Sequence, residues 1–236
     1  MRVLVVSLDA PAALREAGGR EEPRLPVLAM ALELAGADGV RLGVCEGLRP
    51  VRESDLHDVR RVARELELRL APTPSLLKLA LEVRPDRVLL ASEPLRGALE
   101  AGPLDAAALR GPAAQAARAL HEAGIPVWAR LAPDLEAVKG ARAAELAGIE
   151  LHTTALVDLP ERERAGALER LGDAARLAAK LRLAVRAGGA LDARRVRAVI
   201  GAAPVVEGVA VGRELAARAL LVGLDRAVRD LRAELG

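Results

Sequence analysis

Residues 33–42 read ELAGADGVRL, and the same design returns in HEAGIPVWAR (121–130) and ELAGIELH (145–152). In each stretch a helical pattern ends at a glycine, which can take the left-handed conformation that follows a helix, and an apolar strand begins a few residues later. This is the junction between a helix and the next strand in a repeating strand–helix unit. The pattern predicts an α/β fold with parallel strands.

The rest of the chain continues this alternation. Ser54 is placed to cap a helix, and Thr73-Pro74 pairs an N-cap with proline at the first helical position. We expect strands near 2–8, 39–42, 67–71, 87–91, 126–131, 149–152, 183–187 and 205–211. We expect helices near 25–35, 54–65, 74–83, 105–123, 134–147, 161–181, 192–200 and 214–233. Eight units without a linker predict a single (β/α)8 TIM barrel with extra helices over residues 1–236, with an open sheet as the alternative.

Composition narrows the classes of partner. Lys and Arg number 35 against 33 Asp and Glu, which is a near balance rather than a basic surface. Phe and Tyr are absent and Trp128 is the one Trp, so a platform that stacks successive bases is hard to build. We therefore expect no nucleic-acid partner.

The single cysteine, Cys45, excludes an internal disulfide and a cysteine-based zinc site, and it suits a reducing compartment. The first apolar run, in MRVLVVSLDA, is too short for a signal peptide core or a membrane span. No metal-ligand constellation is visible in the sequence. We expect a cytoplasmic protein without a membrane anchor, metal or cofactor.

Function in such a barrel belongs at the carboxyl ends of the strands, where the long connections 9–24, 43–53 and 92–104 lie. Strand side chains alternate, so Ser7 and Asp9 share one face, as do Glu150 and His152. The polar residues expected at these strand ends are Ser7, Asp9, Cys45, Glu46, Arg69, Ser92, Glu93, Arg130, Glu150, His152, Arg186, Gly212 and Arg213.

Glu150 is the best catalytic candidate, because a carboxylate in the apolar strand IELH is costly to bury unpaired. Either it is kept for function, or it pairs with an arginine, for which Arg69, Arg130 and Arg186 are candidates. His152 is open to a structural or a functional interpretation. Cys45 fits an inert loop thiol better than a nucleophile, since no histidine lies nearby in sequence to activate it.

The turn in VRAGGALDA (185–193) carries no side chain that performs chemistry. Gly188 and Gly189, together with Gly212-Arg213, lie after the last two expected strands, where barrels commonly bind phosphate through backbone N–H groups. An ordinary loop is the alternative. We interpret Arg194, Arg195 and Arg197 as a solvated helix face, and His57 and His121 as solvated helix residues.

Eight stretches, in order along the chain, resemble the pyridoxine 5′-phosphate synthases of vitamin B6 biosynthesis. They are VSLDAPAALREAGGR (6–20), ELAGADGVRLGVCEGLRPVRESDLHDVRRV (33–62), ALEVRPDRVLLASEP (80–94), PLD (103–105), EAGIPV (122–127), GIELHT (148–153), LRLAVRAGGAL (181–191) and VGRELAARALLVGLDRAV (211–228). The resemblance implies a TIM barrel, often octameric. It also implies condensation of 1-deoxy-D-xylulose 5-phosphate with 3-amino-2-oxopropyl phosphate by histidine and glutamate acid–base chemistry, without metal or cofactor.

This chain matches the family pattern at Asp9, Glu93, Glu150, His152-Thr153 and Gly212, and it departs from that pattern at other functional positions. The family's strand-1 ending Asn-x-Asp-His becomes Ser7, Asp9 and Ala10, and its strand-2 His-x-Arg with a later His becomes Gly43, Cys45 and Pro50. Its strand-3 catalytic Glu falls on Arg69, and a ligand-binding Thr falls on Leu99. Its catalytic His of the seventh turn falls on Gly189, and its Gly-His phosphate pair becomes Gly212-Arg213.

These departures favour anion binding over acid–base chemistry. Each lost proton-transfer group is typically worth ~10²–10⁴ in rate, whereas arginine at 69 and 213 grips phosphate oxygens. One hypothesis is a divergent synthase in which Cys45, Glu46 or His152 took over proton transfer. The other is a non-catalytic barrel that binds a phosphorylated metabolite or acts as an assembly or regulatory partner. Under either, we expect a phosphorylated small-molecule ligand and a homo-oligomer.

Overall fold

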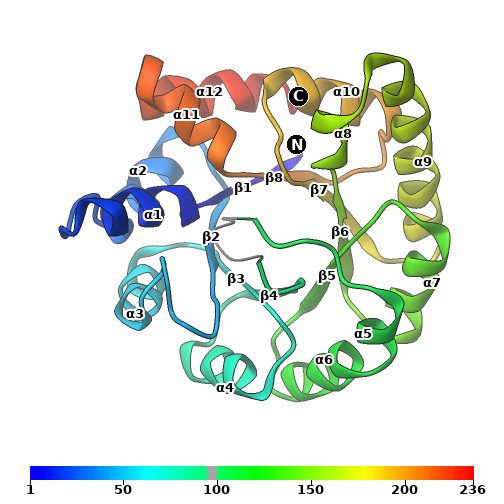
Figure 1. The fold of residues 1–236 in the computed structure, drawn as a ribbon, viewed down its shortest axis with the longest axis horizontal. Coiled ribbons are helices and arrows are strands. Elements are labelled where there is room, and N and C mark those ends of the chain that lie inside the picture. Colours follow the sequence, from blue (N-terminus) through cyan, green and yellow to red (C-terminus); the bar gives the residue numbers. More distant parts are fainter. Residues whose placement is uncertain (95–99) are drawn as a thin grey trace.

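The computed structural model describes residues 1–94 and 100–236, and its eight parallel strands form a closed barrel (Figure 1). Each strand pairs with its neighbours in sequence, and β8 pairs with β1 to complete the ring. The prediction of a (β/α)8 barrel rather than an open sheet is confirmed. The strands are β1 Val3–Ser7, β2 Gly39–Gly43, β3 Leu66–Leu70, β4 Arg87–Leu90, β5 Val127–Leu131, β6 Gly148–His152, β7 Ala184–Gly188 and β8 Gly208–Val211.

Helices surround the barrel on all sides (Figure 1). Those in the described residues are α1 Asp9–Gly18, α2 Leu25–Ala35, α3 Glu53–Val62, α4 Pro74–Val83, α5 Ala106–Arg110, α6 Pro112–Glu122, α7 Leu135–Ala143, α8 Ala155–Asp158, α9 Glu161–Lys180, α10 Ala193–Ala202, α11 Arg213–Val222 and α12 Leu224–Ala233. The helices that we expected at 105–123 and 214–233 are each divided in two. Gly111 separates the first pair, and Gly223, at φ +84°, separates the second.

The connection after β1 differs from the expected loop because it contains α1. Asp9 begins this helix, and Gly19 ends it in the left-handed conformation at φ +59°. Ser54 is not the N-cap that we predicted: α3 begins one residue earlier, and the Asp55 carboxylate accepts the backbone N–H of Arg52 at 2.8 Å. These errors arise at helix ends, where several polar side chains compete to satisfy the same amides.

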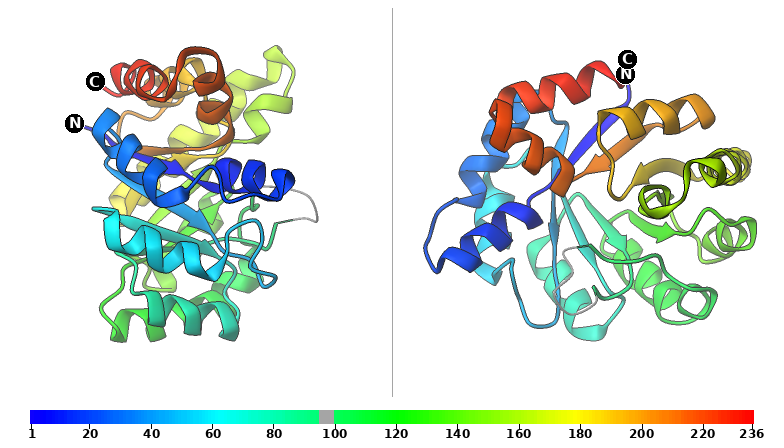
Figure 2. Two further views of the ribbon diagram at one scale, coloured as in Figure 1. Left: turned by 90° about the vertical axis from the view of Figure 1, so that its left-hand side faces the viewer. Right: turned by 45° about the horizontal axis from the view of Figure 1, so that its top comes forward.

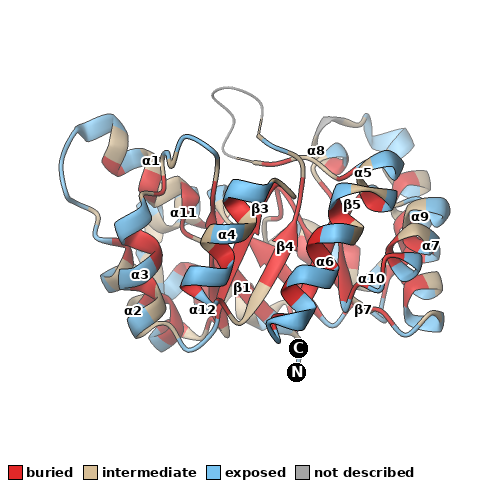
Figure 3. Ribbon diagram, turned by 90° about the horizontal axis from the view of Figure 1, so that it is seen from below, coloured by how far each residue is buried: buried red, intermediate tan, exposed pale blue. Residues whose placement is uncertain are grey.

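The apolar core lies between the strands and the helices (Figure 3). Leu42, Leu68, Leu90 and Leu151 are each fully buried in this layer. Since strand side chains alternate, the residues between them point into the barrel. The strands therefore have an apolar outer face and a separate inner face.

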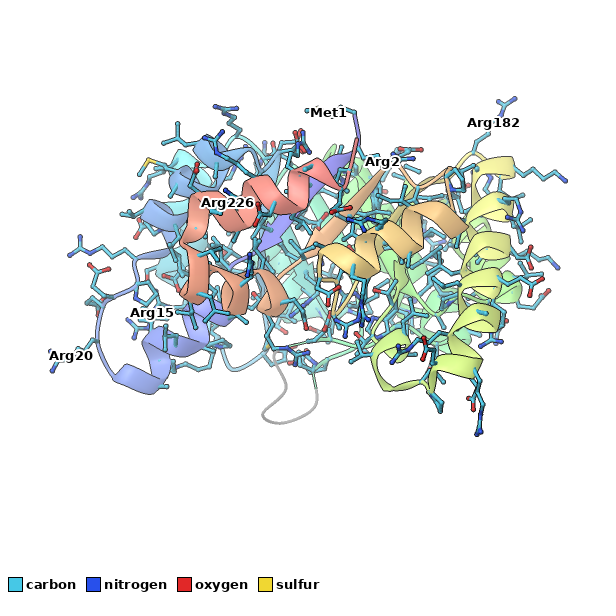
Figure 4. The ribbon with its side chains drawn as sticks, turned by 90° about the horizontal axis from the view of Figure 1, so that it is seen from above. Met1, Arg2, Arg15, Arg20, Arg182 and Arg226 are labelled. Atoms are coloured by element: carbon cyan, nitrogen blue, oxygen red, sulfur yellow. The ribbon has the colours of Figure 1, made fainter. Side chains whose placement is uncertain are left out.

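Charged side chains on the helices have two different fates. Arg20 and Arg182 extend away from the molecule (Figure 4), and His57 and His121 are exposed as predicted. Arg15 on α1 instead makes a buried, two-bonded ion pair with Asp55 on α3, at 2.6 and 2.7 Å. This pair joins the helix that follows β1 to the one that follows β2.

The chain termini lie together at the amino end of the barrel (Figure 2). There the Arg2 guanidinium donates to the carbonyl oxygen of Leu235 at 3.1 Å. Helices α1 and α8 lie at the opposite end, where the strands finish (Figure 3). No helix among the described residues is long and apolar enough to span a membrane.

Candidate functional site

The inner face of the barrel carries charged residues in place of the branched apolar side chains that usually fill such barrels. Five of them form what we call the interior ion cluster: Arg41 on β2, Glu67 on β3, Arg130 on β5, Glu150 on β6 and Arg186 on β7. None is more than 3% exposed. At this depth the charges must compensate one another.

Glu150 is the centre of the cluster and accepts bonds from three arginines. Arg130 and Arg186, its neighbours in register on β5 and β7, donate from Nη2 at 2.6 Å and from Nε at 2.9 Å respectively. Arg41 reaches Glu150 across the barrel from β2 with both terminal nitrogens. The predicted pairing of Glu150 with Arg130 and Arg186 is confirmed, and Arg41 is a third partner that we did not predict.

Glu67 closes the cluster on the other side. It accepts the Nε of Arg41 at 2.5 Å and the Nη2 of Arg186 at 2.7 Å, and Arg87 lies 3.6 Å from its Oε2. Trp128 packs between two of these cations, with the guanidinium carbons of Arg87 and Arg186 each 4.9 Å from its ring centroid. Ion pairs with Glu67 and contacts with the Trp128 ring thus hold these arginine side chains in place.

Arg69 does not pair with Glu150, so that part of the prediction is wrong. It lies one layer nearer the mouth, where its Nη2 is 3.0 Å from Asp9 Oδ2. The other Asp9 oxygen accepts the backbone N–H of Gly43 at 2.6 Å. A Cβ atom at Gly43 would lie 2.5 Å from Arg69 Nη2 and 2.7 Å from the Asp9 carboxylate. The Arg69–Asp9 ion pair therefore occupies the space that a side chain at position 43 would need, and glycine at this position leaves room for the pair.

The cluster carboxylates are held in the ionised form. Burial opposes ionisation of Glu150, but the charges of Arg41, Arg130 and Arg186 outweigh it and hold the pKa of this carboxyl well below its usual range. The same balance of burial against arginine charges lowers the pKa of Glu67. Both groups are therefore carboxylates at neutral pH.

Two further candidates for proton transfer, His152 and Cys45, are held in their neutral forms, whereas the third, Glu46, is exposed and the hydrogen bonds from Thr73 and Ser75 lower the pKa of its carboxyl. Burial, followed by the charge of Arg130, lowers the pKa of His152 to about 4. The buried His152 Nδ1 has no hydrogen-bond partner among the described residues. Burial and the Glu93 carboxylate raise the pKa of the Cys45 thiol to about 11. At pH 7 the imidazole is thus unprotonated, and the thiol is not a thiolate.

The turn at 188–190 is closely packed. Gly189 has φ +110° and Ala190 φ +49°, and their carbonyl oxygens accept bonds from Thr153 Oγ1 and, at 3.1 Å, from Arg195 Nη1. Arg195 also pairs with Asp192 at 3.1 Å, so it supports the turn and is not part of a solvated face as we expected. Arg194 and Arg197 are exposed, as predicted.

Three polar groups surround the side of Gly189 where a side chain would project. A Cβ atom there would lie 2.8 Å from Thr154 Oγ1, 3.1 Å from Glu100 Oε1 and 3.1 Å from His152 Nδ1. A Cβ atom at Gly188 would meet the Glu150 carboxylate at 2.5 Å. A side chain at either position would therefore require these neighbouring side chains to move.

One cavity opens at the carboxyl ends of the strands, and we call it the mouth cavity. Its polar lining is Ser7, Asp9, Arg41, Arg69, Glu100, Arg130, Arg213 and Glu214, and the backbone of Gly189, Ala190 and Gly212 also borders it. The structure thus brings seven of the predicted residues to one place: Ser7, Asp9, Arg69, Arg130, Gly189, Gly212 and Arg213. The Ser7 hydroxyl accepts the backbone N–H of Asp9 at 3.3 Å.

The remaining predicted residues lie around this cavity. Glu150, Arg186 and Gly188 are buried deeper in the barrel, and His152 is half-buried behind Gly189. Cys45 and the exposed Glu93 follow β2 and β4, and the Glu46 carboxylate accepts the hydroxyl groups of Thr73 and Ser75. Leu99 lies outside the described residues. Within 1–94 and 100–236, no three His, Cys, Asp or Glu side chains are grouped as metal ligands.

Arg41, Glu67 and Glu100 are site residues that our sequence analysis missed. Arg41 and Glu67 interrupt apolar strands just as Glu150 does, in GVRLG and LELRL, so the same argument about buried charge applies to them. No comparable signal marks Glu100, because it lies in a connection and reaches the mouth only through the fold.

Comparison with known proteins gives one consistent assignment. The sequence model described as "Pyridoxal phosphate biosynthesis protein PdxJ" matches residues 4–236. A protein of Geobacter metallireducens named pyridoxine 5′-phosphate synthase is 37% identical over 234 residues, covering 98% of this chain and 97% of that protein. One of the same name from Desulfatibacillum aliphaticivorans is 34% identical over 234 residues, covering 99% and 98%.

A solved structure adds evidence on the fold alone. Tryptophan synthase subunit alpha from Legionella pneumophila superposes with a TM-score of 0.65 and 16% identity, covering 99% of this chain and 92% of that one. At this identity the likeness extends to the barrel and not to the chemistry. The full-length sequence matches carry the assignment, and they show that this chain belongs to the PdxJ family of pyridoxal phosphate biosynthesis proteins.

Proposed function

We propose that this chain is a pyridoxine 5′-phosphate synthase-like protein whose mouth cavity binds a phosphorylated small molecule without carrying out the synthase reaction. The observation that carries the proposal is the lining of that cavity. Arg41, Arg69, Arg130 and Arg213 border it together with the glycine turn. Guanidinium groups bind phosphate oxygens with paired hydrogen bonds, and a glycine turn lets backbone approach the anion closely.

The proton-transfer groups support the non-catalytic half of the proposal. A general acid or base works best with a pKa near the operating pH, so that it is present in both forms. His152, with a pKa of about 4, and Cys45, with a pKa of about 11, are far from that range, and Glu150 is held ionised. His152 and Cys45 are thus poorly tuned for proton transfer, and hydrogen bonds from Thr73 and Ser75 lower the pKa of the Glu46 carboxyl, which moves it further from neutral pH.

The positions that depart from the family pattern support it further, because they are adapted to one another. Gly43 leaves room for the Arg69–Asp9 pair, and the space beside Gly189 is bordered by Glu100, Thr154 and His152. Restoring one histidine would clash with its present neighbours. Such mutual adaptation is expected if the acid–base residues of the family pattern were replaced together, by residues that form ion pairs and bind a ligand.

Binding is tested by calorimetric titration with 1-deoxy-D-xylulose 5-phosphate and with inorganic phosphate. We expect both to bind, with an affinity that falls as salt rises, because the contacts are charged. Arg213→Ala removes a mouth cation and should weaken binding about tenfold or more. Arg229→Ala is the matched control, since Arg229 pairs with Asp225 on the surface of α12. Equal affinities in the two variants would remove Arg213 from the site.

The catalytic alternative has one specific observation in its favour, which is 37% identity over nearly the full length to a protein named pyridoxine 5′-phosphate synthase. Complementation separates the two functions. A strain that lacks the family enzyme and expresses this chain should not grow without added vitamin B6, and the purified protein should form no pyridoxine 5′-phosphate. Growth would overturn the proposal and assign proton transfer to His152 or to another group in the mouth.

We also propose that the chain self-associates. Leu34 on α2 is 80% exposed, and Leu220 and Leu221 on α11 are 82% and 79% exposed. Fully exposed leucines on helices α2 and α11 favour burial against another protein surface. Light scattering should therefore give a mass above the 24.7 kDa of one chain. Leu220→Glu with Leu221→Glu should lower it, and a wild-type monomer would contradict the proposal.

A further inference from the structure

The inner face of the barrel holds more cations than anions. Arg41, Arg69, Arg87, Arg130 and Arg186 face the three carboxylates of Asp9, Glu67 and Glu150 among the described residues of this region. Burial and the charges of Arg41 and Arg69 lower the pKa of Arg130, despite its contact with Glu150. A buried positive excess of this kind attracts a further anion.

Glu100 partly supplies that anion. Its Oε1 lies 3.3 Å from Arg130 Nη1, and its Oε2 accepts the Thr154 hydroxyl at 3.4 Å. These are long contacts compared with the 2.6 Å from Arg130 Nη2 to Glu150 and the 2.7 Å from Arg130 Nη1 to the carbonyl oxygen of Ala101. Weak hydrogen bonds hold Glu100, and 28% of its side chain is exposed. It is the replaceable partner of Arg130.

Glu100 also limits the room in the mouth cavity. The space open to a water-sized molecule there is about 40 Å³, which is enough for only a few waters or one small anionic group. Arg41, Arg69 and Arg130 border the same cavity, as does the glycine turn. A larger ligand must therefore displace a side chain, and among the carboxylates paired with the lining arginines, Glu100 has the longest ion-pair distance.

We propose that Arg130, together with Arg41 and Arg69 in the same cavity lining, forms a second anion subsite, and that Glu100 pairs with the Arg130 part of it until a ligand carboxylate replaces Glu100. The inference rests on the proposed function, because the ligand's phosphate binds at the glycine turn and Arg213. The ligand class is a short phosphorylated carboxylic acid. A carboxylate is the group expected at this subsite because Glu100 already places one on Arg130.

The spacing of the two subsites limits the length of the ligand. Glu100 Oε1 contacts Arg130 and lies 3.1 Å from the point where a side chain of Gly189 would begin. The replaced carboxylate is therefore adjacent to the phosphate-binding turn. A backbone of about three carbons between the phosphate and the carboxylate spans such neighbouring positions.

The test uses two probes that differ only at one end, 3-phosphoglycerate and glycerol 3-phosphate. Calorimetry at constant ionic strength compares the wild type with Glu100→Gln, which keeps the shape of the side chain and removes its charge. The control is Glu136→Gln on α7, where Glu136 pairs with Lys139 on the surface. It changes the net charge equally without touching the mouth.

We expect the wild type to bind 3-phosphoglycerate about tenfold more tightly than glycerol 3-phosphate, because one probe fills both subsites. Glu100→Gln should raise the affinity for 3-phosphoglycerate by about threefold or more and change that for glycerol 3-phosphate by less than about twofold. Glu136→Gln should alter neither.

Two results would overturn the inference in distinguishable ways. Binding of both probes with equal affinity, or an equal gain for both in Glu100→Gln, removes the second subsite and leaves phosphate binding at the turn intact. Failure of both probes to bind, to the wild type and to Glu100→Gln alike, removes the proposed function together with the inference.

Discussion

The outer face of the eight strands buries apolar side chains, whereas the inner face of the same strands buries charged ones. On the outer face, Leu42, Leu68 and Leu151 pack against helices without directional bonds. On the inner face, Arg41, Glu67 and the residues that join them are satisfied only by partners at fixed positions on other strands. Apolar packing tolerates exchange of similar volumes, whereas a buried ion cluster depends on every member. The outer face therefore stabilises the fold by apolar packing, whereas the inner face holds one specific arrangement of charges.

The largest expected effect comes from breaking the inner face at its centre. Glu150→Ala leaves Arg41, Arg130 and Arg186 without their shared carboxylate, and we expect a loss of about 3–5 kcal/mol in the free energy of unfolding. The matched change on the outer face is Leu151→Ala, with a loss of about 2–5 kcal/mol from the cavity that it creates. Chemical denaturation measures both.

Chemical rescue distinguishes the loss of an ion pair in Glu150→Ala from the cavity created in Leu151→Ala. Added formate, a small carboxylate, should restore part of the stability of Glu150→Ala, because an anion can occupy the vacated site. It should leave Leu151→Ala unchanged. An unfolding free energy of Glu150→Ala equal to that of the wild type would show that the buried cluster contributes nothing net.

A smaller effect is expected from pH, through His152 beside the inner face. Its folded-state pKa of about 4 lies below the ordinary value of 6.5, so between these two values the unfolded chain binds more protons than the folded one. Stability should therefore fall as pH decreases from 6.5 towards 4, by about 2 kcal/mol after allowance for partial exposure. His152→Gln should flatten this slope. The contributions of Glu67 and Glu150 are lost only below about pH 4.5, in the range of their unfolded pKa.

The next effect on stability is expected at Gly189, whose backbone conformation favours glycine. Gly189→Ala places a Cβ atom 2.8 Å from Thr154 Oγ1 at a φ of +110°, so we expect a loss of about 1–3 kcal/mol. Gly201→Ala is the control: this helical glycine has nothing within 4 Å of a built Cβ atom, and alanine should stabilise it by about 0.5–1 kcal/mol. Thermal melts of the two variants should shift in opposite directions. A shift of the same sign in both would contradict the tight packing around Gly189.

The smallest effect on stability is expected at the rim. Arg213 is 61% exposed and pairs with the neighbouring Glu214 at 2.9 Å, so Arg213→Ala should change the unfolding free energy by less than about 0.5 kcal/mol. Its effect on phosphate affinity should nevertheless be large. A melt lowered by several degrees would show that Arg213 supports the fold and would weaken its assignment as a ligand contact.

From the sequence alone, the eight strands and their order could be predicted, and a closed barrel was favoured over an open sheet. Glycines after helices and short apolar runs are local signals, which is why 33–42, 121–130 and 145–152 each mark a helix–strand junction. It also indicated that Glu150 needs a cation, because the cost of burying an unpaired charge can be judged from one strand. The ends of elements were less certain: α1 and α8 were missed, and Gly111 and Gly223 divide helices that we expected to be continuous.

The cations that pair with Glu150 and the residues that line the mouth cavity could be identified only in the folded chain. Arg41 and Glu150 are 109 residues apart and meet because β2 and β6 face each other across the barrel. Arg69 pairs with Asp9 because its layer is nearer the mouth, and Glu100 reaches Arg130 from a connection outside the strands. The reason is physical: alternation along a strand fixes the face to which a side chain points, but barrel closure fixes which distant residue it meets.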